Sequence, residues 1–164
     1  MESMKQQLAG LGAALLLLGS CNTNGSLTTS GLNPTAFDTT INGKKVELYT
    51  LTNGKGMEVC LTNYGGRVVS ISVPDKNGKA TDVVLGYDNI KQYADTLKSP
   101  SDYGSSVGRY ANRIKDAVLH IGDKSYQLKA NDNGNCLHGG GTTGWLNKVY
   151  DVQSVTDSSI VFAM

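Results

Sequence analysis

The fold is decided by residues 57–73, which read MEVCLTNYGGRVVSISV. On both sides of the Gly65-Gly66 pair, apolar residues alternate with polar or small ones. A repeat of two residues is the side-chain period of a β-strand, and adjacent glycines readily adopt the positive φ angles that a tight hairpin needs. We therefore expect two antiparallel strands joined at this pair.

Similar alternation recurs along most of the chain after residue 40, with turn pairs at Asn53-Gly54 and Asn77-Gly78. Further strands are expected at Val46–Tyr49, Leu119–Ile121, Ser125–Leu128, Val149–Val155 and Ile160–Phe162. The segment Asp88–Asp95 carries a short helical signal, because its apolar residues have the spacing of one helix face. These features predict an all-β fold, an antiparallel β-sandwich with one short helix.

The composition limits the size of the fold and the kinds of partner. With 164 residues, 39% of them hydrophobic, the chain has the size of one globular domain. Lys and Arg number 15 against 14 Asp and Glu, and no basic stripe with interleaved aromatic residues is present. We therefore expect no nucleic-acid partner, and a neutral small molecule fits the charge balance better.

The first residues have the pattern of a targeting segment. Lys5 precedes the apolar run Leu8–Leu18, which is too short to span a bilayer. Residues 1–20 therefore read as a signal peptide. Leu18-Gly19-Ser20-Cys21 resembles the bacterial lipobox, so we expect lipid attachment at Cys21 and a flexible polar tether over residues 21–40. The alternative is a plain secretory signal with an incidental cysteine. Lipidation would place the protein in the bacterial cell envelope, with the membrane as a partner.

The remaining cysteines, Cys60 and Cys136, permit one disulfide without requiring it. Cys136 also lies two residues before His138, which raises the question of a metal site. No second histidine pair or carboxylate cluster nearby completes a coordination shell. We expect no metal and no organic cofactor.

Two glycine-rich motifs carry the candidate functional groups. Residues 108–114 read GRYANRI, and residues 137–141 read LHGGG. A guanidinium, an amide and an imidazole together match the donor and acceptor character of adjacent sugar hydroxyls, and glycines let the backbone come close to a ligand. The alternative is an ordinary surface pair, Asn112 and Arg113, beside a glycine-rich loop.

From about Tyr49 to Trp145 the chain resembles the aldose 1-epimerase (mutarotase) family. Besides the two glycine-rich motifs, the matching stretches are LTNG (51–54), LTNYGG (61–66), VPD (73–75) and DVVLG (82–86), in the family's order. The resemblance implies the large twisted β-sandwich of the mutarotase fold and covers the family's front half. Residues 41–164 are therefore expected to form the N-terminal part of such a sandwich. The apolar end, Ile160–Met164, predicts that the chain is truncated there.

The resemblance also implies a function: interconversion of the α and β anomers of hexoses such as galactose and glucose. The family's acid and base are a His and a Glu in motifs of its later half, so no catalytic residue is assigned in this chain. Asn112, Arg113 and His138 match residues that bind the sugar. For Arg109 we expect an ion pair or turn contact, and for Trp145 a place in the core rather than on a sugar face.

Other residues and functions carry less weight. His120 reads as a strand histidine, and the sequence does not decide between a loop and a cleft position for Asp102. The alternative function is a non-catalytic carbohydrate-binding surface lipoprotein. An epimerase of phosphorylated hexoses ranks last, because it would need more basic residues around the sugar.

Overall fold

The computed structural model describes residues 26–95 and 102–164. Strands dominate this part of the chain, which confirms the all-β prediction, and α1 (Ile90–Ala94) is its one α-helix, within the segment where it was expected. Short 3-10 helices are η1 (Pro34–Phe37), η2 (Lys115–Ala117), η3 (Gly141–Thr143) and η4 (Trp145–Asn147). In the described ranges no helix has the length and apolarity to cross a membrane. The predicted signal peptide and Cys21 lie outside the described residues.

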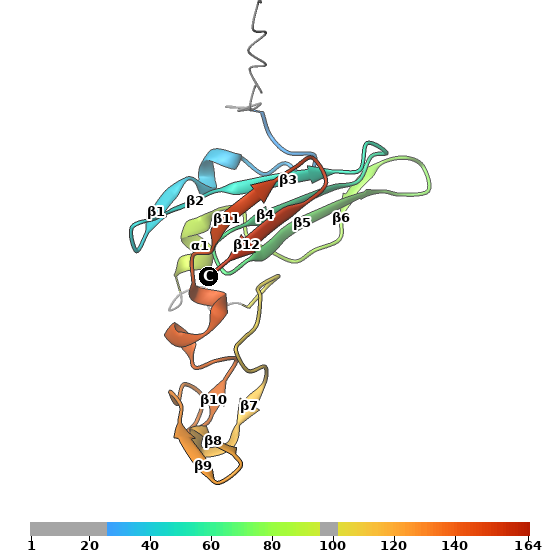
Figure 1. The fold of residues 1–164 in the computed structure, drawn as a ribbon. Coiled ribbons are helices and arrows are strands. Elements are labelled where there is room, and N and C mark those ends of the chain that lie inside the picture. The colour runs from blue at the N-terminus through green and yellow to red at the C-terminus, as the bar shows by residue number, and fades with distance from the viewer. Residues whose placement is uncertain (1–25, 96–101) are drawn as a thin grey trace, which may run out of the picture.

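The central element is a four-stranded antiparallel sheet in the order β3-β4-β5-β6 (Figure 1). Its strands are β3 (Leu48–Thr52), β4 (Glu58–Thr62), β5 (Arg67–Pro74) and β6 (Ala80–Asp82). Thr62 pairs with Arg67 across the turn at Gly65-Gly66, where both glycines have positive φ. The hairpin expected from residues 57–73 is therefore confirmed.

The remaining strands form two-stranded antiparallel pairs. They are β1 (Thr39–Ile41) with β2 (Lys44–Val46), β7 (Arg113–Ile114) with β10 (Cys136–Leu137), β8 (Val118–Ile121) with β9 (Lys124–Gln127), and β11 (Asp151–Val155) with β12 (Ile160–Ala163). The β11–β12 hairpin packs near β3, with the rings of Tyr49 and Phe162 edge to face at 6.2 Å. The β7–β10 segment lies apart from the central sheet (Figure 1).

The hydrophobic core lies between the central sheet and the two helices η1 and α1. Phe37 from η1 is fully buried and lies 6.4 Å from the ring of Tyr93 in α1. Cys60 and Val69 contribute from β4 and β5. Packing of an apolar face against helices is what gives a short strand pattern its stability.

From residue 28 onward, the segment expected to be a flexible tether (residues 21–40) is folded onto the domain. Thr29 bonds through its amide and its hydroxyl to the Glu58 carboxylate, at 2.7 and 2.9 Å. Asn33 caps η1 by accepting from the Thr35 amide, and Phe37 enters the core. The polar residues here make turns and caps, so their composition resembles that of a linker. The packed domain accordingly begins before residue 41.

Both described cysteines are buried and free, so the possible disulfide between Cys60 and Cys136 does not form. Burial raises the pKa of the Cys60 thiol. Because the thiolate is the reactive form, Cys60 behaves as a small apolar residue of the core.

The turn at residues 63–66 fastens the rest of the chain to the sheet. The amide of Gly65 donates to the carbonyl of Lys148, and its carbonyl accepts from the Ser106 amide. Arg67, fully buried, donates to the carbonyls of Tyr103 and Leu146 at 3.0 and 3.1 Å. The segments that lead into and out of the β7–β10 region are thus both anchored at one point.

Candidate functional site

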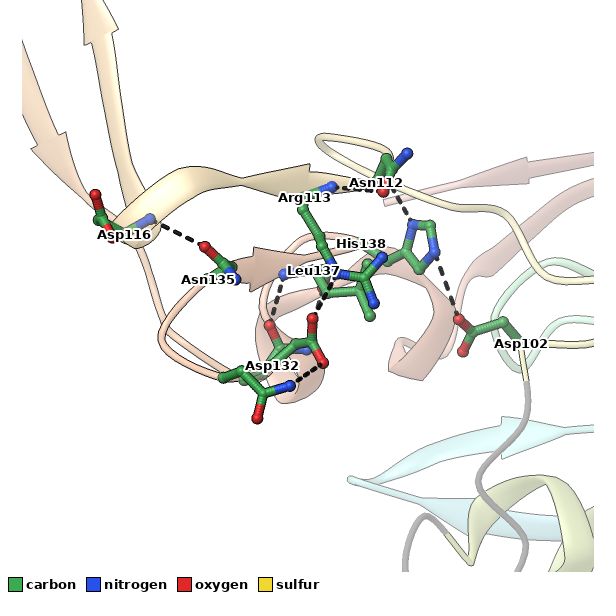
Figure 2. Close-up of polar contacts among 10 residues, drawn as sticks. Asp102, Asn112, Arg113, Asp116, Asp132, Asn135, Leu137 and His138 are labelled. Atoms are coloured by element: carbon green, nitrogen blue, oxygen red, sulfur yellow. Dashed lines mark hydrogen bonds and ion pairs between the residues drawn. The ribbon is translucent and has the colours of Figure 1, made fainter.

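Pairing of β7 with β10 brings the two glycine-rich motifs together. Arg113 pairs with Leu137 in the antiparallel register, so the residue before Arg113 meets the residue after Leu137 (Figure 2). The His138 amide donates to the Asn112 carbonyl at 3.1 Å, and the Asn112 amide donates to His138 Nδ1 at 3.0 Å. The three residues predicted to bind substrate therefore form one cluster.

The backbone of this cluster is mostly left-handed. Asn112 and His138 have φ of 58° and 51°, and Gly139 and Gly140 have φ of 89° and 87°. A Cβ atom at Gly139 would collide with the Gly108 carbonyl oxygen. This close approach explains why a glycine follows the histidine and why the two motifs occur together.

The hydrogen bond from Asn112 fixes the proton position on the His138 ring. Nδ1 accepts the backbone N–H, so the neutral ring carries its proton on Nε2. Nε2 lies 3.9 Å from Asp102 Oδ2, as Figure 2 shows. The half-buried imidazole therefore offers one N–H donor on the side that faces Asp102.

Arg113 is held at two points. Its amide donates to Asn112 Oδ1 at 2.9 Å, and its Nε donates to Asp132 Oδ2 at 2.6 Å. Asn131 brackets Leu137 through bonds to both its amide and its carbonyl, at 2.7 and 3.1 Å. The loop before β10 thus supports the residues on either side of the cluster.

Sequence reasoning missed Asp132 and left Asp102 undecided. Asp132 stands in the stretch NDNGN (131–135), whose Asx-turn composition signals an ordered loop but not a contact with Arg113. The structure places Asp102 beside His138. Both carboxylates lie next to residues that the motifs had identified.

The outcomes for the aromatic and basic neighbours differ from expectation. Trp145 is half-buried and lies outside the hydrophobic core, so its predicted core position is wrong. The Arg109 guanidinium lies over the Trp145 ring, 5.5 Å from its centre, in a cation–π contact instead of the expected ion pair or turn contact.

His120 is an exposed residue of β8 whose Nδ1 lies 2.8 Å from Ser125 Oγ, as expected for a strand histidine.

A cavity of about 700 Å³ opens beside the cluster. Arg109, Tyr110, Gly139 and Trp145 line it, whereas none of the three predicted sugar-binding residues does. Asn112 and Arg113 instead project from the surface. Among the described residues, no three His, Cys, Asp or Glu side chains lie close enough to hold a metal ion.

Comparisons with known proteins show which family and which relatives this chain resembles. The family described as Aldose 1-epimerase matches residues 47–164. A probable aldose 1-epimerase of Arthroderma benhamiae is 32% identical over 151 residues, covering 90% of this chain and 34% of that protein. The galactose mutarotase of Mus musculus is 38% identical over 115 residues, covering 70% of this chain and 32% of that protein.

Solved structures agree. An aldose epimerase homologue from C. elegans superimposes with a TM-score of 0.65 at 33% identity, covering 71% of this chain and 35% of that one. The chain spans about a third of the length of these relatives. The predicted mutarotase-like β-sandwich class is confirmed, with the coverage of an N-terminal part. This chain belongs to the aldose 1-epimerase family.

Proposed function

We propose that this chain carries part of the sugar-binding surface of an aldose 1-epimerase that interconverts the α and β anomers of hexoses such as galactose and glucose. The observation that carries the proposal is the hydrogen-bonded cluster of Asn112, Arg113 and His138. Family membership supplies the reaction class.

Anomer exchange needs a base that removes the proton from the C1 hydroxyl and an acid that protonates the ring oxygen. The ring then opens, rotates about the C1–C2 bond and closes. The resemblance assigns the acid and base to motifs that this chain does not contain. The role proposed for these 164 residues is therefore binding and orientation of the sugar.

The cluster presents hydrogen-bond donors. His138 offers Nε2–H because its Nδ1 is engaged by Asn112, and Asn112 offers Nδ2 because its Oδ1 accepts from Arg113. Arg113 adds its Nη groups. Donors directed at sugar oxygens stabilise the negative charge that develops when the ring opens.

Titration of the full chain with galactose by calorimetry tests the binding role. We expect Arg113→Ala to weaken galactose binding about tenfold, because charge-assisted hydrogen bonds are the strong ones. Lys124→Ala, which removes a positive charge from the exposed strand β9, is the control and should bind like the parent. Equal affinity of Arg113→Ala and parent would remove Arg113 from the site.

A second candidate function is a non-catalytic carbohydrate-binding surface lipoprotein. It is favoured because neither of the chain's two histidines is assigned as a catalytic acid. His120 bonds to Ser125, and His138 belongs to the binding cluster. Polarimetry of freshly dissolved α-galactose, with a longer form of the chain that includes a downstream His and Glu, separates the candidates. Faster relaxation of the rotation identifies an isomerase, and binding without acceleration identifies the lipoprotein.

We also propose that Cys21 is lipidated and that the protein resides in the bacterial cell envelope. The sequence of an apolar run followed by Leu18-Gly19-Ser20-Cys21 supports this. Cys21→Ser should move the protein from the membrane fraction to the soluble fraction. Unchanged membrane fractionation would contradict lipid anchoring at this cysteine.

A further inference from the structure

The ion pair between Arg113 and Asp132 uses a particular part of the guanidinium. Asp132 Oδ2 accepts from Nε at 2.6 Å, the donor nearest the aliphatic stem. The Asp132 side chain is 22% exposed, whereas that of Arg113 is 55% exposed. A guanidinium held at Nε keeps a fixed plane and retains four Nη–H donors for a ligand.

Asp132 is itself fixed by its loop. Its amide donates to the Asn135 carbonyl at 3.2 Å, and the Asn135 amide donates back to the Asp132 carbonyl at 2.8 Å. The preceding residue, Asn131, bonds to both backbone groups of Leu137, which directly precedes His138. One short loop therefore sets Arg113 and His138 relative to each other.

Asp132 also changes the charge that a ligand meets. It neutralises the Arg113 cation at contact distance, and Asp102 places a second carboxylate near His138. The one permanent cation of the cluster, Arg113, thus stands with two neighbouring carboxylates, which opposes an anionic ligand. A neutral sugar meets hydrogen-bond donors without an excess of positive charge.

We propose that Asp132 is a positioning and specificity-determining residue: it orients the Arg113 guanidinium toward the sugar and makes the site prefer neutral over acidic sugars. This inference rests on the proposed sugar-binding function of Arg113. It assigns a role to a residue that does not itself need to touch the sugar.

Calorimetric titration of the full chain with galactose and with galacturonate tests the proposal. Asp132→Asn keeps the shape and removes the charge, so we expect galactose affinity to fall about fivefold. The variant should also shift the ratio of galactose to galacturonate affinity at least about threefold toward the acid, because the Arg113 charge is no longer balanced. A merely structural role would weaken both sugars alike.

Asp123→Asn is the matched control, since Asp123 lies in the exposed turn between β8 and β9 and should leave both affinities unchanged. The structural arm uses NMR of arginine Nε–H groups, of which the chain has three. The Arg113 signal, identified by its loss in Arg113→Lys, should move in Asp132→Asn and stay in Asp123→Asn.

Each outcome separates the two proposals. If the parent binds galactose and Asp132→Asn has the same affinities and the same ratio, the role of Asp132 is overturned while the proposed function stands. If the parent binds neither sugar, the proposed function fails. An Arg113 Nε–H signal that does not respond to Asp132→Asn overturns the positioning role regardless of sugar binding.

Discussion

Gly139 occupies a position that no other residue fits. Its φ of 89° lies in the left-handed region, and a Cβ atom would strike the Gly108 carbonyl. That same carbonyl accepts from the Trp145 amide at 2.9 Å. The glycine therefore lets the His138 loop and the segment before Asn112 pack closely, which places the imidazole beside Asn112.

Gly139→Ala and Gly134→Ala form a matched pair that tests this close packing. Gly134 has a φ of 84°, but a Cβ atom added there would meet no atom of the described residues within 4 Å. We expect Gly134→Ala to lower the free energy of unfolding by about 1 kcal/mol, the penalty of left-handed backbone. Gly139→Ala should lower it by about 3 kcal/mol, since overpacking is added. Equal values in urea unfolding would contradict the account.

At the scale of elements, local rules predicted the hairpins but not η1. The β4–β5 hairpin followed from alternation and a glycine turn, both of which act within a few residues. The segment 28–38 has polar composition, yet two of its residues, Leu32 and Phe37, are buried in the core. Composition averages over residues, so it does not reveal two buried apolar side chains within a polar run.

Phe37→Ala tests whether η1 is part of the folded domain. Loss of a fully buried phenylalanine should lower the free energy of unfolding by about 3–5 kcal/mol. Leu27→Ala, at a position that is 64% exposed, should change it by less than about 0.5 kcal/mol. Chemical denaturation measures both values. If Phe37→Ala leaves the free energy of unfolding unchanged, η1 is not part of the folded domain.

At the scale of the whole molecule, Arg67 links the central sheet to the segments that carry the site. Its guanidinium lies 5.7 and 5.1 Å from the ring centres of Tyr64 and Tyr93 and bonds to two carbonyls from distant segments. Burial lowers the pKa of Arg67, yet an arginine remains charged at neutral pH. The link is therefore a buried, charge-assisted one.

Arg67→Lys keeps the charge and removes the fork that reaches both carbonyls. We expect the free energy of unfolding to fall by about 3 kcal/mol, because hydrogen bonds of a buried charge are lost. Arg109→Lys makes the same change at an exposed residue and should have an effect below about 1 kcal/mol. Urea unfolding of both variants measures this difference. An equal loss of unfolding free energy in Arg67→Lys and Arg109→Lys would contradict the linking role of Arg67.

The candidate site was predictable only in part. Asn112, Arg113 and His138 stand in motifs whose wording identifies them, and the structure brings them together. Asp132 lies 19 residues from Arg113, and its contact depends on how the loop at 131–135 folds. Sequence spacing does not encode such an approach between side chains.

Sugar binding by the cluster of Asn112, Arg113 and His138 is tested by an NMR titration of the labelled full chain with galactose, following the ring signals of its two histidines. His138 belongs to the proposed sugar-binding cluster, whereas His120 on β8 bonds to Ser125. We expect the His138 ring signals to shift and saturate while those of His120 stay in place. A His138 ring that does not respond, or two histidines that respond equally, would contradict it.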